Sequence, residues 1–313
     1  MADTGTAQHT LGERAAFQLA NVTKTPPQYG AITPRWLVRF LDWKPLEAGS
    51  LRVNRVVDEK SVEVICDQKG EQDLPDSYVN YDEKPREYTL NSISAVVDVQ
   101  TKISDLFSNP FDQIREQLRL ATETVKERQE SELLNNSDYG LLKNVADSQR
   151  IKARAGAPTP DDLDELLTKV WKEPSFFLAH PRAIAAFGRE CTRRGVPPPT
   201  VTLFGTPFLT WRGIPIVPTD KIHVDGKAKP TSPGGKTSIL LLRVGEKKQG
   251  VIGLFQPGLP GEQTPGLSVR FMGISRKAIG SYLISLYCSA AILTDDAIAV
   301  LEQVEVGNYH EYK

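Results

Sequence analysis

Apolar and polar residues alternate along three stretches within residues 50–99, which read SLRVNRVV, SVEVICD and EYTLNSISAVVDV. A period of two places successive side chains on opposite faces, so each stretch predicts a strand. The acidic, weakly apolar segment KGEQDLPDSYVNYDEKPRE separates the last two. We predict a two- or three-stranded ribbon that projects from the body. Because an isolated ribbon is only marginally stable in water, it should pack on another copy of the chain.

A different spacing, of three and four residues, begins after Asn109 and predicts a long helix. Asn109 suits the N-cap position and Pro110 the first helical position. One narrow apolar stripe follows, made of Phe111, Ile114, Leu118, Ala121 and Val125. The pattern continues to about Asn135, which gives a helix of about 40 Å at 1.5 Å per residue.

The N-terminal leader is apolar on one side but too short to form a core. Residues 12–20 have a helical pattern, and Thr33 can cap a second helix with Pro34 at its first position. We therefore expect residues 12–45 to run along a neighbouring copy or to cross the inner side of an assembly of copies. Their aromatic anchors would be Trp36, Phe40 and Trp43.

Helices and strands alternate through the rest of the chain. Thr159, Pro160 and Asp162 form a cap that opens the helix DDLDELLTKVWK. PSFFLAHP predicts a buried strand, and PRAIAAFGRECTRR a helix that Gly195 ends. Further strands are expected in VTLFGTPFLTW, GIPIVPTD, SILLLRVG, QGVIGLFQ, LSVRFMG, SYLISLYCSAAIL and DDAIAVLEQVEV. The predicted fold class is α+β.

Prolines punctuate one of these strands, in WRGIPIVPTD. Proline has no backbone N–H to donate to a ladder, so strands tolerate it at edges, at their first residue and at bulges. We therefore expect Ile214–Pro218 to lie near a sheet edge or to bend.

Composition narrows the function classes. The net charge of -1 gives no electrostatic basis for binding nucleic acid or an anionic membrane. The N-terminal residues have no apolar core, so no signal peptide is expected, and no apolar run approaches the roughly 18 residues that span a bilayer. The cysteines Cys66, Cys191 and Cys288 are odd in number and far apart, which indicates a reducing cytoplasm.

Residues that might support catalysis are few, and each has a simpler interpretation. PGGKTS lacks the first glycine of a phosphate-binding loop, because that position is Pro230, so a surface loop is expected. His180 could face a pocket, although a capping or packing role is favoured. Asp295 and Asp296 are expected at a turn or surface, and Cys191 as a buried structural thiol. The chain is not expected to be an enzyme, and a soluble enzyme with a cleft near His180 stays an alternative.

The order of leader, extended loop, long helix, α+β domain and late strands resembles the Hong Kong 97-type capsid fold of tailed phages. The blocks TPRWLVRFLDW, YVNYDEKPREYTL, GAPTPDDLDELLTKVWK, SFFLAHPRAIAAFGRE, RGVPPP and LFQPGL are similar to family 2 encapsulin shell proteins. The likeness is to subgroup A, which lacks an inserted cyclic-nucleotide-binding domain. It implies an N-terminal arm (1–48), an extended loop (49–92), a peripheral domain (93–158 and 266–313) and an axial domain (159–265).

The resemblance also implies a function. Encapsulin shells are closed icosahedral compartments, here of sixty copies, that enclose a cargo enzyme. In the matching subgroup the cargo is a cysteine desulfurase, held by its disordered N-terminal segment, and sulfur metabolism or storage is implied. The chain itself would bind no cofactor, since pyridoxal phosphate belongs to the cargo, and would bind neither nucleic acid nor membrane. A true phage-type capsid protein is the other alternative.

The resemblance places a pore at the fivefold axes of such a shell, lined by the loop after the helix that Gly195 ends. Three prolines would make this loop stiff, since each fixes φ and removes a donor. Two arginines would add positive charge at the opening or pair with acids of an adjacent copy. The expected pore residues are Arg193, Arg194, Gly195, Pro197, Pro198 and Pro199.

Overall fold

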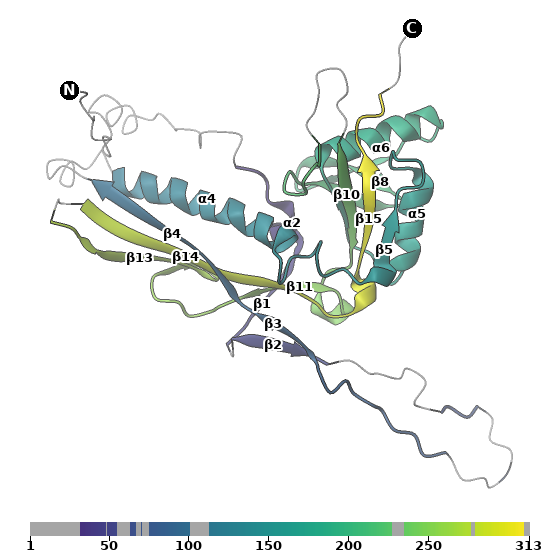
Figure 1. The fold of residues 1–313 in the computed structure, drawn as a ribbon, viewed down its shortest axis with the longest axis horizontal. Coiled ribbons are helices and arrows are strands. Elements are labelled where there is room, and N and C mark those ends of the chain that lie inside the picture. Colours follow the sequence, from purple (N-terminus) through teal and green to yellow (C-terminus); the bar gives the residue numbers. More distant parts are fainter. Residues whose placement is uncertain are drawn as a thin grey trace.

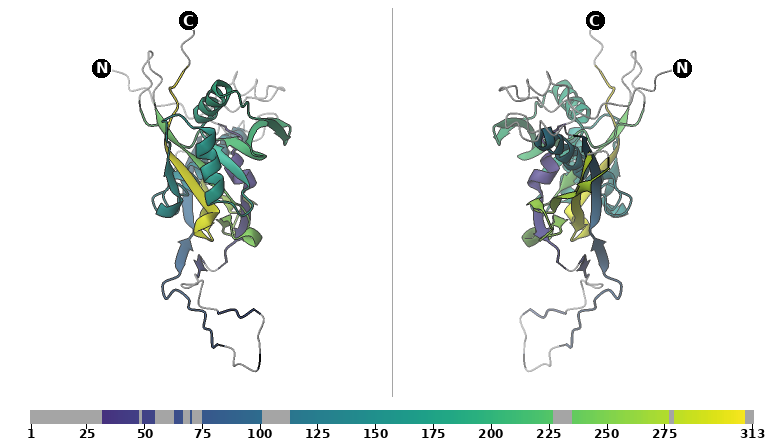
Figure 2. Two further views of the ribbon diagram at one scale, coloured as in Figure 1. Left: turned by 90° about the vertical axis from the view of Figure 1, so that its right-hand side faces the viewer. Right: turned by 90° about the vertical axis from the view of Figure 1, so that its left-hand side faces the viewer.

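The computed structural model describes residues 32–47, 49–54, 63–66, 70, 75–100, 113–226, 235–276 and 279–309. Two β-sheets lie side by side, and a long loop projects from the end of the body (Figure 1, Figure 2). The predicted helix at 12–20 and the caps Asn109 and Pro110 lie outside the described residues.

A six-stranded sheet carries the spine helix α4 (Gln113–Asn135) along one face (Figure 1). Val125 is buried against the sheet, and Leu118 and Ala121 pack beside it, which confirms this part of the predicted apolar stripe and the end at Asn135. Phe111 of the stripe lies outside the described residues. The sheet comprises β1 (Asp42–Pro45), β4 (Asn91–Gln100), β11 (Val251–Phe255), β12 (Glu262–Thr264), β13 (Leu267–Ile274) and β14 (Ile279–Ile292).

A seven-stranded sheet forms the second body of the chain, in the order β5-β15-β10-β6-β9-β8-β7. Helices α5 (Pro160–Lys169) and α6 (Pro181–Arg193) cover one face through a core that includes Leu166 and Phe187. The strands are β5 (Arg150–Lys152), β6 (Phe176–Ala179), β7 (Thr200–Leu203), β8 (Thr206–Trp211), β9 (Ile214–Pro218), β10 (Lys236–Leu242) and β15 (Ile298–Glu305). The short helices η1 (Asp147–Gln149), η2 (Glu246–Lys248) and η3 (Asp295–Ala297) lie in the connections.

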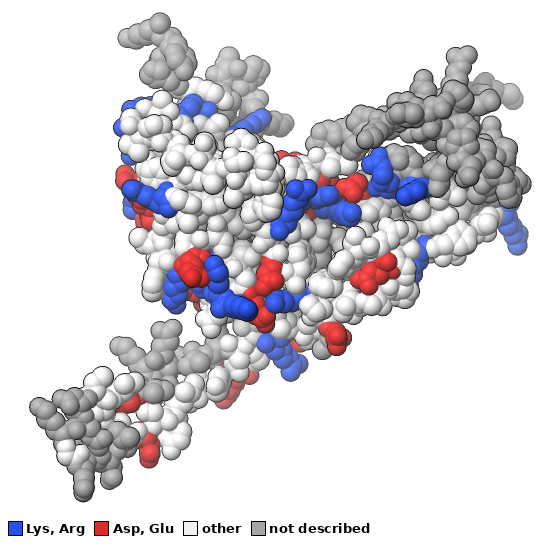
Figure 3. Space-filling view, turned by 180° about the vertical axis from the view of Figure 1, so that it is seen from behind, with Lys and Arg blue, Asp and Glu red and all other residues white. Residues whose placement is uncertain are grey.

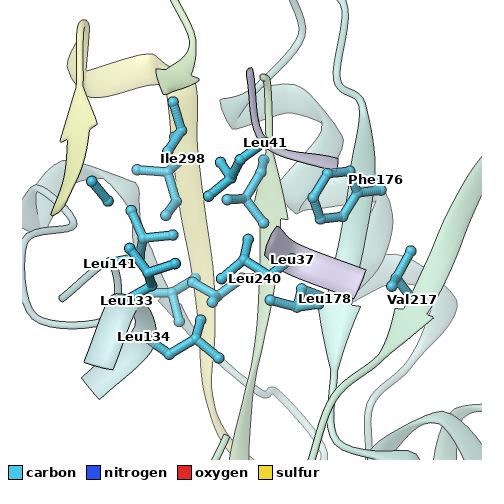
Figure 4. Packing of buried hydrophobic residues seen from close by; sticks show 14 of the residues in the cluster. Leu37, Leu41, Leu133, Leu134, Leu141, Phe176, Leu178, Val217, Leu240 and Ile298 are labelled. Carbon is cyan, nitrogen blue, oxygen red and sulfur yellow. The ribbon is translucent and has the colours of Figure 1, made fainter. Parts of the chain in front are cut away.

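The opposite face of this sheet meets the C-terminal end of α4 and the leader helix α2 (Trp36–Phe40). Figure 4 shows Leu133 and Leu134 of α4 and Leu37 of α2 converging on Leu178 and Leu240 of the sheet. The helix α4 therefore contributes to the cores of both sheets.

Two predicted caps have different outcomes. Thr159 and Asp162 form the expected capping box, in which the Asp162 carboxylate accepts from the Thr159 backbone and the Thr159 hydroxyl oxygen accepts from the Asp162 backbone. The predicted cap by Thr33 is wrong. The helix begins at Trp36 after Arg35, which has a positive φ of 50°, and the Thr33 hydroxyl donates to Glu127 of α4 instead.

The proline-bearing strand β9 is not at an edge, because it lies between β6 and β8. Both of its faces are buried, since Ile216 and Val217 enter different cores. Its pairing with β8 is confined to Thr210 with Pro215 and Trp211 with Ile214. Pro218, the last residue, lies beyond that pairing and interrupts no ladder with β8.

The predicted ribbon is shorter than expected. Among the described residues, β2 (Ser50–Val53) and β3 (Arg86–Thr89) pair as a hairpin base. The third predicted stretch is divided between β3 and β4, and β4 belongs to the six-stranded sheet. Residues 63–66 lie outside any strand, because alternation alone supplies no partner for backbone hydrogen bonds.

Pairings late in the chain refine two expectations. VTLFGTPFLTW is a hairpin rather than one strand, and it turns at Phe204 and Gly205, which both have positive φ. The last two predicted strands, β14 and β15, are confirmed, but they belong to different sheets. Strand β11 pairs with β14, and β15 pairs with β10, so sheet pairing crosses the boundary expected at 265/266.

Candidate assembly surfaces

The loop after α6 forms an exposed tip at the end of the seven-stranded sheet. Gly195, with φ of 72°, ends the helix in a Schellman arrangement, in which Val196 N donates to Cys191 O and Gly195 N to Thr192 O. Residues 192–197 and 199–202 are exposed. The tip is tied to β8, because Thr210 N donates to Pro199 O over 2.8 Å. The tip is therefore exposed and anchored at one end, and its place at a pore stays a prediction.

The two arginines at this tip pair with acids of their own chain. Arg193 Nη1 lies 3.2 Å from Glu190 Oε2, and Arg194 Nε lies 2.9 Å from Glu190 Oε1. Arg194 Nη1 also lies 3.4 Å from Asp161 Oδ2. The predicted pairing with an adjacent copy is thus not needed to neutralise them, and the positive charge at the tip is partly offset.

The leader anchors pack inside their own chain. Trp36 is only 4% exposed, and its ring contacts those of Phe204 and Phe208 at centroid distances of 6.1 and 5.1 Å. The ring centroids of Phe40 and Phe176 are 4.9 Å apart, and Trp43 Nε1 donates to Val38 O. Trp36 and Phe40 therefore pack within their own chain, where α2 lies over the seven-stranded sheet, and Trp43 packs on Gly253 of β11. A further contact of these residues with a neighbouring copy stays a prediction.

The projecting loop, whose described residues are 63–66, 70 and 75–85, carries several exposed apolar and aromatic side chains. Val64, Tyr78 and Tyr81 are 76%, 74% and 62% exposed. Acidic side chains lie on this loop, whereas acidic and basic side chains alternate over the face of the body seen in Figure 3. Exposed aromatic residues at this density are typical of a surface that another protein covers.

A groove runs along α4, between this helix and the segment from Phe255 to Leu267. Its two parts are cavities of about 530 and 540 Å³ that share Lys126. Apolar side chains such as Leu118 and Leu286 line it. Its cationic residues are Arg35, Arg39, Arg115, Arg119 and Lys126, and Glu123 adds one acid.

The residues considered for catalysis have structural roles. His180 caps α6, since its Nδ1 accepts from Arg182 N. Burial raises the pKa of the Cys191 thiol to about 11, which leaves it neutral and inert. Asp295 and Asp296 lie in η3, where Asp296 pairs with the buried Arg243 over 2.7 Å. Pro230 falls outside the described residues, and Thr237 of the PGGKTS segment lies in β10.

Within the described ranges, no group of histidine, cysteine and acidic side chains could hold a metal ion. The helices in these ranges are likewise too short or too polar to cross a bilayer. What the described geometry offers is surface for contacts between proteins.

The arrangement of spine helix, projecting loop and terminal tip is that of the Hong Kong 97-type capsid fold. The capsid protein of an empty GTA particle superposes with a TM-score of 0.60 at 14% identity, covering 95% of this chain and 99% of the other. This likeness shows that the chain has the fold of the capsid proteins.

The family can be stated more narrowly. The sequence profile described as SrpI-like type 2A encapsulin shell protein matches residues 48–308. The type 2A encapsulin shell protein SrpI of Synechococcus elongatus is 63% identical over 306 residues, 98% of this chain and 97% of the relative. The cryo-electron microscopy structure of the holo-SrpI encapsulin complex of Synechococcus elongatus superposes with a TM-score of 0.82 at 62% identity, covering 97% and 99% of the two chains. The chain belongs to the type 2A encapsulin shell proteins, a family of shell proteins and not of enzymes.

Proposed function

We propose that this protein assembles into a closed icosahedral shell of sixty copies that encloses a cargo enzyme in the cytoplasm. Membership of the type 2A encapsulin shell family is the observation that carries this proposal. In an icosahedral shell of sixty copies every chain has the same environment, so each contact between two surfaces is repeated identically in every copy.

The projecting loop is proposed to make the principal contact between copies. Its segment DQKGEQDLPDSYVNYDEK contains six acids and two lysines. The groove along α4 is lined by five cationic residues, one acid and several apolar side chains, and Glu123 pairs with Arg35 and Lys126. Opposite charges guide the contact, and the exposed Tyr78 and Tyr81 would supply the buried aromatic area.

The tip from Arg193 to Pro199 is proposed to surround the opening at each fivefold axis. Its exposure and its stiffness support this role. Passage would be limited to small solutes, and the residual positive charge would favour anions.

The cargo is proposed to be a cysteine desulfurase, whose pyridoxal phosphate belongs to the cargo and not to this chain. Its disordered N-terminal segment would dock on the interior with weak individual contacts, since ordering a flexible segment costs free energy. Many sites per shell would compensate through avidity. The resemblance to the subgroup supports this cargo and a role in sulfur metabolism or storage.

Negative-stain microscopy of the protein purified alone tests the shell. Closed particles of uniform size are expected, and a protein that stays a monomer to tetramer would contradict the proposal. Purification from the native host tests the cargo separately. A companion desulfurase is expected, and its absence from intact shells would reject the cargo while leaving the shell in place.

A further inference from the structure

A buried carboxylate on α4 has half of its hydrogen-bonding capacity unused. Glu130 is 1% exposed, and its Oε1 accepts from Thr219 Oγ1 over 2.8 Å. Its Oε2 is buried without a hydrogen-bond partner. An ionised oxygen that is removed from water and has no donor is unfavourable, so this site favours a neutral side chain.

Charged groups from three segments surround Glu130. On α4 itself, Glu127 accepts from Thr33 and lies 3.0 Å from Lys221 Nζ. After β9, Asp220 also lies 3.0 Å from Lys221 Nζ, so this lysine is shared between two acids. From the leader, Arg35 approaches Glu127 at 3.7 Å. The available cations are therefore committed to other carboxylates, and none lies within salt-bridge distance of Glu130 among the described ion pairs.

The segment Thr219–Lys221 joins the two bodies of the chain. Thr219 N donates to Ala179 O at the end of β6, in the seven-stranded sheet. Asn135 Nδ2 of α4 donates to Lys221 O over 2.9 Å. Glu130 and Asn135 thus hold α4, which packs on the six-stranded sheet, against a segment fixed to the seven-stranded sheet.

We propose that Glu130 is a proton-binding contact, which holds α4 against Thr219–Lys221 more tightly when its carboxyl group is protonated. The proton removes the charge from the unpartnered Oε2, while Oε1 continues to accept from Thr219. Burial is the main cause that raises the pKa of Glu130 to about 7, against the lowering effects of Thr219 and Lys221. The change of state therefore falls near neutral pH.

The direction of the effect follows from proton linkage. The folded pKa lies above the ordinary value of 4.5, so the folded chain binds more protons than the unfolded chain between these two values. This contribution to stability is greatest in mild acid and is lost as the pH rises toward 7. Burial lowers the pKa of His180, so the contribution of His180 to stability decreases as the pH falls below about 6.5. Because this pH dependence opposes that of Glu130, each variant must be compared with the parent protein.

The experiment is denaturant unfolding of the assembled protein at pH 5.5, 7 and 8. Between pH 5.5 and 8 the unfolding equilibrium constant of the parent protein should increase about thirtyfold more than that of Glu130→Gln, which cannot ionise. At pH 8 Glu130→Gln should be the more stable protein. Glu132→Gln, on the same helix but paired with Arg128, is the matched control and should keep the parent pH dependence.

A second variant guards against a Glu130→Gln chain that fails to assemble. In the parent protein, the hydrogen bond from Thr219 to Oε1 lowers the pKa of Glu130. Thr219→Val removes this donor and should therefore raise that pKa further. The loss of stability should then extend to higher pH than in the parent protein. Equal pH dependence in the parent and Glu130→Gln proteins would overturn the proposal. If Glu130→Gln does not assemble, an unchanged profile for Thr219→Val would overturn it.

Discussion

The indole ring of Trp43 lies directly against Gly253, so that a β-carbon at residue 253 would stand 2.6 Å from the ring atom Cε3. The two residues are also partners in the parallel register of β1 and β11. Glycine is therefore the residue that lets β1 of the leader pair with β11 at the edge of the six-stranded sheet. The leader is part of the body at this point and not a free arm.

Gly253→Ala should displace the Trp43 ring and lower stability by about 1–3 kcal/mol, the usual cost of overpacking. The denaturant midpoint of the assembled protein measures this effect. Gly188→Ala is the control, because nothing lies within 4 Å of a β-carbon there, and in helix α6 it should be neutral or slightly stabilising. Equal midpoints for the two variants would contradict the packing described.

Trp36→Ala should lower stability by about 3–5 kcal/mol, because it removes a buried ring from the contacts with Phe204 and Phe208. The loss should appear in the folding of a single chain as well as in particle disassembly. Trp171→Ala, at a residue that is 70% exposed, should leave chain folding unchanged. If Trp36→Ala alters only disassembly, the ring serves contacts between copies after all.

Asp296→Asn should cost about 3–5 kcal/mol, because it leaves the buried Arg243 guanidinium without its charged partner. Burial of Asp296 opposes ionisation, but hydrogen bonds from Arg243, Thr294 and Lys172 hold its pKa well below the ordinary 3.8. A depressed folded pKa gives stability that is present above about pH 4 and is lost as the pH falls further. Asp295→Asn, whose pairing with Arg86 is more exposed, should cost far less in the same unfolding assay.

Deletion of Asp67–Lys84 should leave folded small oligomers in place of shells, because the deletion removes the acidic and aromatic surface of the projecting loop. Size-exclusion chromatography with light scattering distinguishes the two outcomes. Shortening the polar segment 227–234 is the control and should still give full particles. Full-size particles from the first deletion would show that this loop is dispensable for assembly.

Glu190→Gln should increase the entry of small anions relative to cations into cargo-loaded shells, because it frees Arg193 and Arg194 from their shared acid. Arg193→Glu with Arg194→Glu should shift the ratio toward cations. Entry of charged probes followed by cargo turnover measures the ratio. If neither variant changes it, these residues do not surround the opening.

Local patterns in the sequence predicted the elements well where local chemistry decides them. The apolar stripe of α4, the capping box at Thr159 and the helix end at Gly195 each depend on residues close in the chain. The α+β class and the late strands followed from the same reasoning. The capsid-type fold came instead from several sequence blocks in a recognised order.

The errors concern relationships between distant residues. Thr33 has the chemistry of a cap, but Glu127, 94 positions away, accepts its hydrogen bonds instead. The proline pattern of β9 indicated an edge, yet the short pairing with β8 lets the strand lie inside the sheet. The leader residues Trp36 and Phe40 were predicted to need a neighbouring copy, because the sequence does not reveal that β6 and β8 of the same chain lie beneath them. The groove along α4 combines residues from both ends of the chain, so no local motif marks it.

Helix α4 packs on the six-stranded sheet through Val125 and on the core of the seven-stranded sheet through Leu133 and Leu134. A rotation of one sheet against the other must therefore bend this helix or expose the two leucines. In a closed particle, α4 would therefore be the element of each chain that resists rotation of the two sheets against each other. The resistance of the shell to indentation should then depend on Leu133 and Leu134 at the C-terminal end of α4. Leu134→Ala should lower the indentation stiffness of the particle without weakening the contacts between copies.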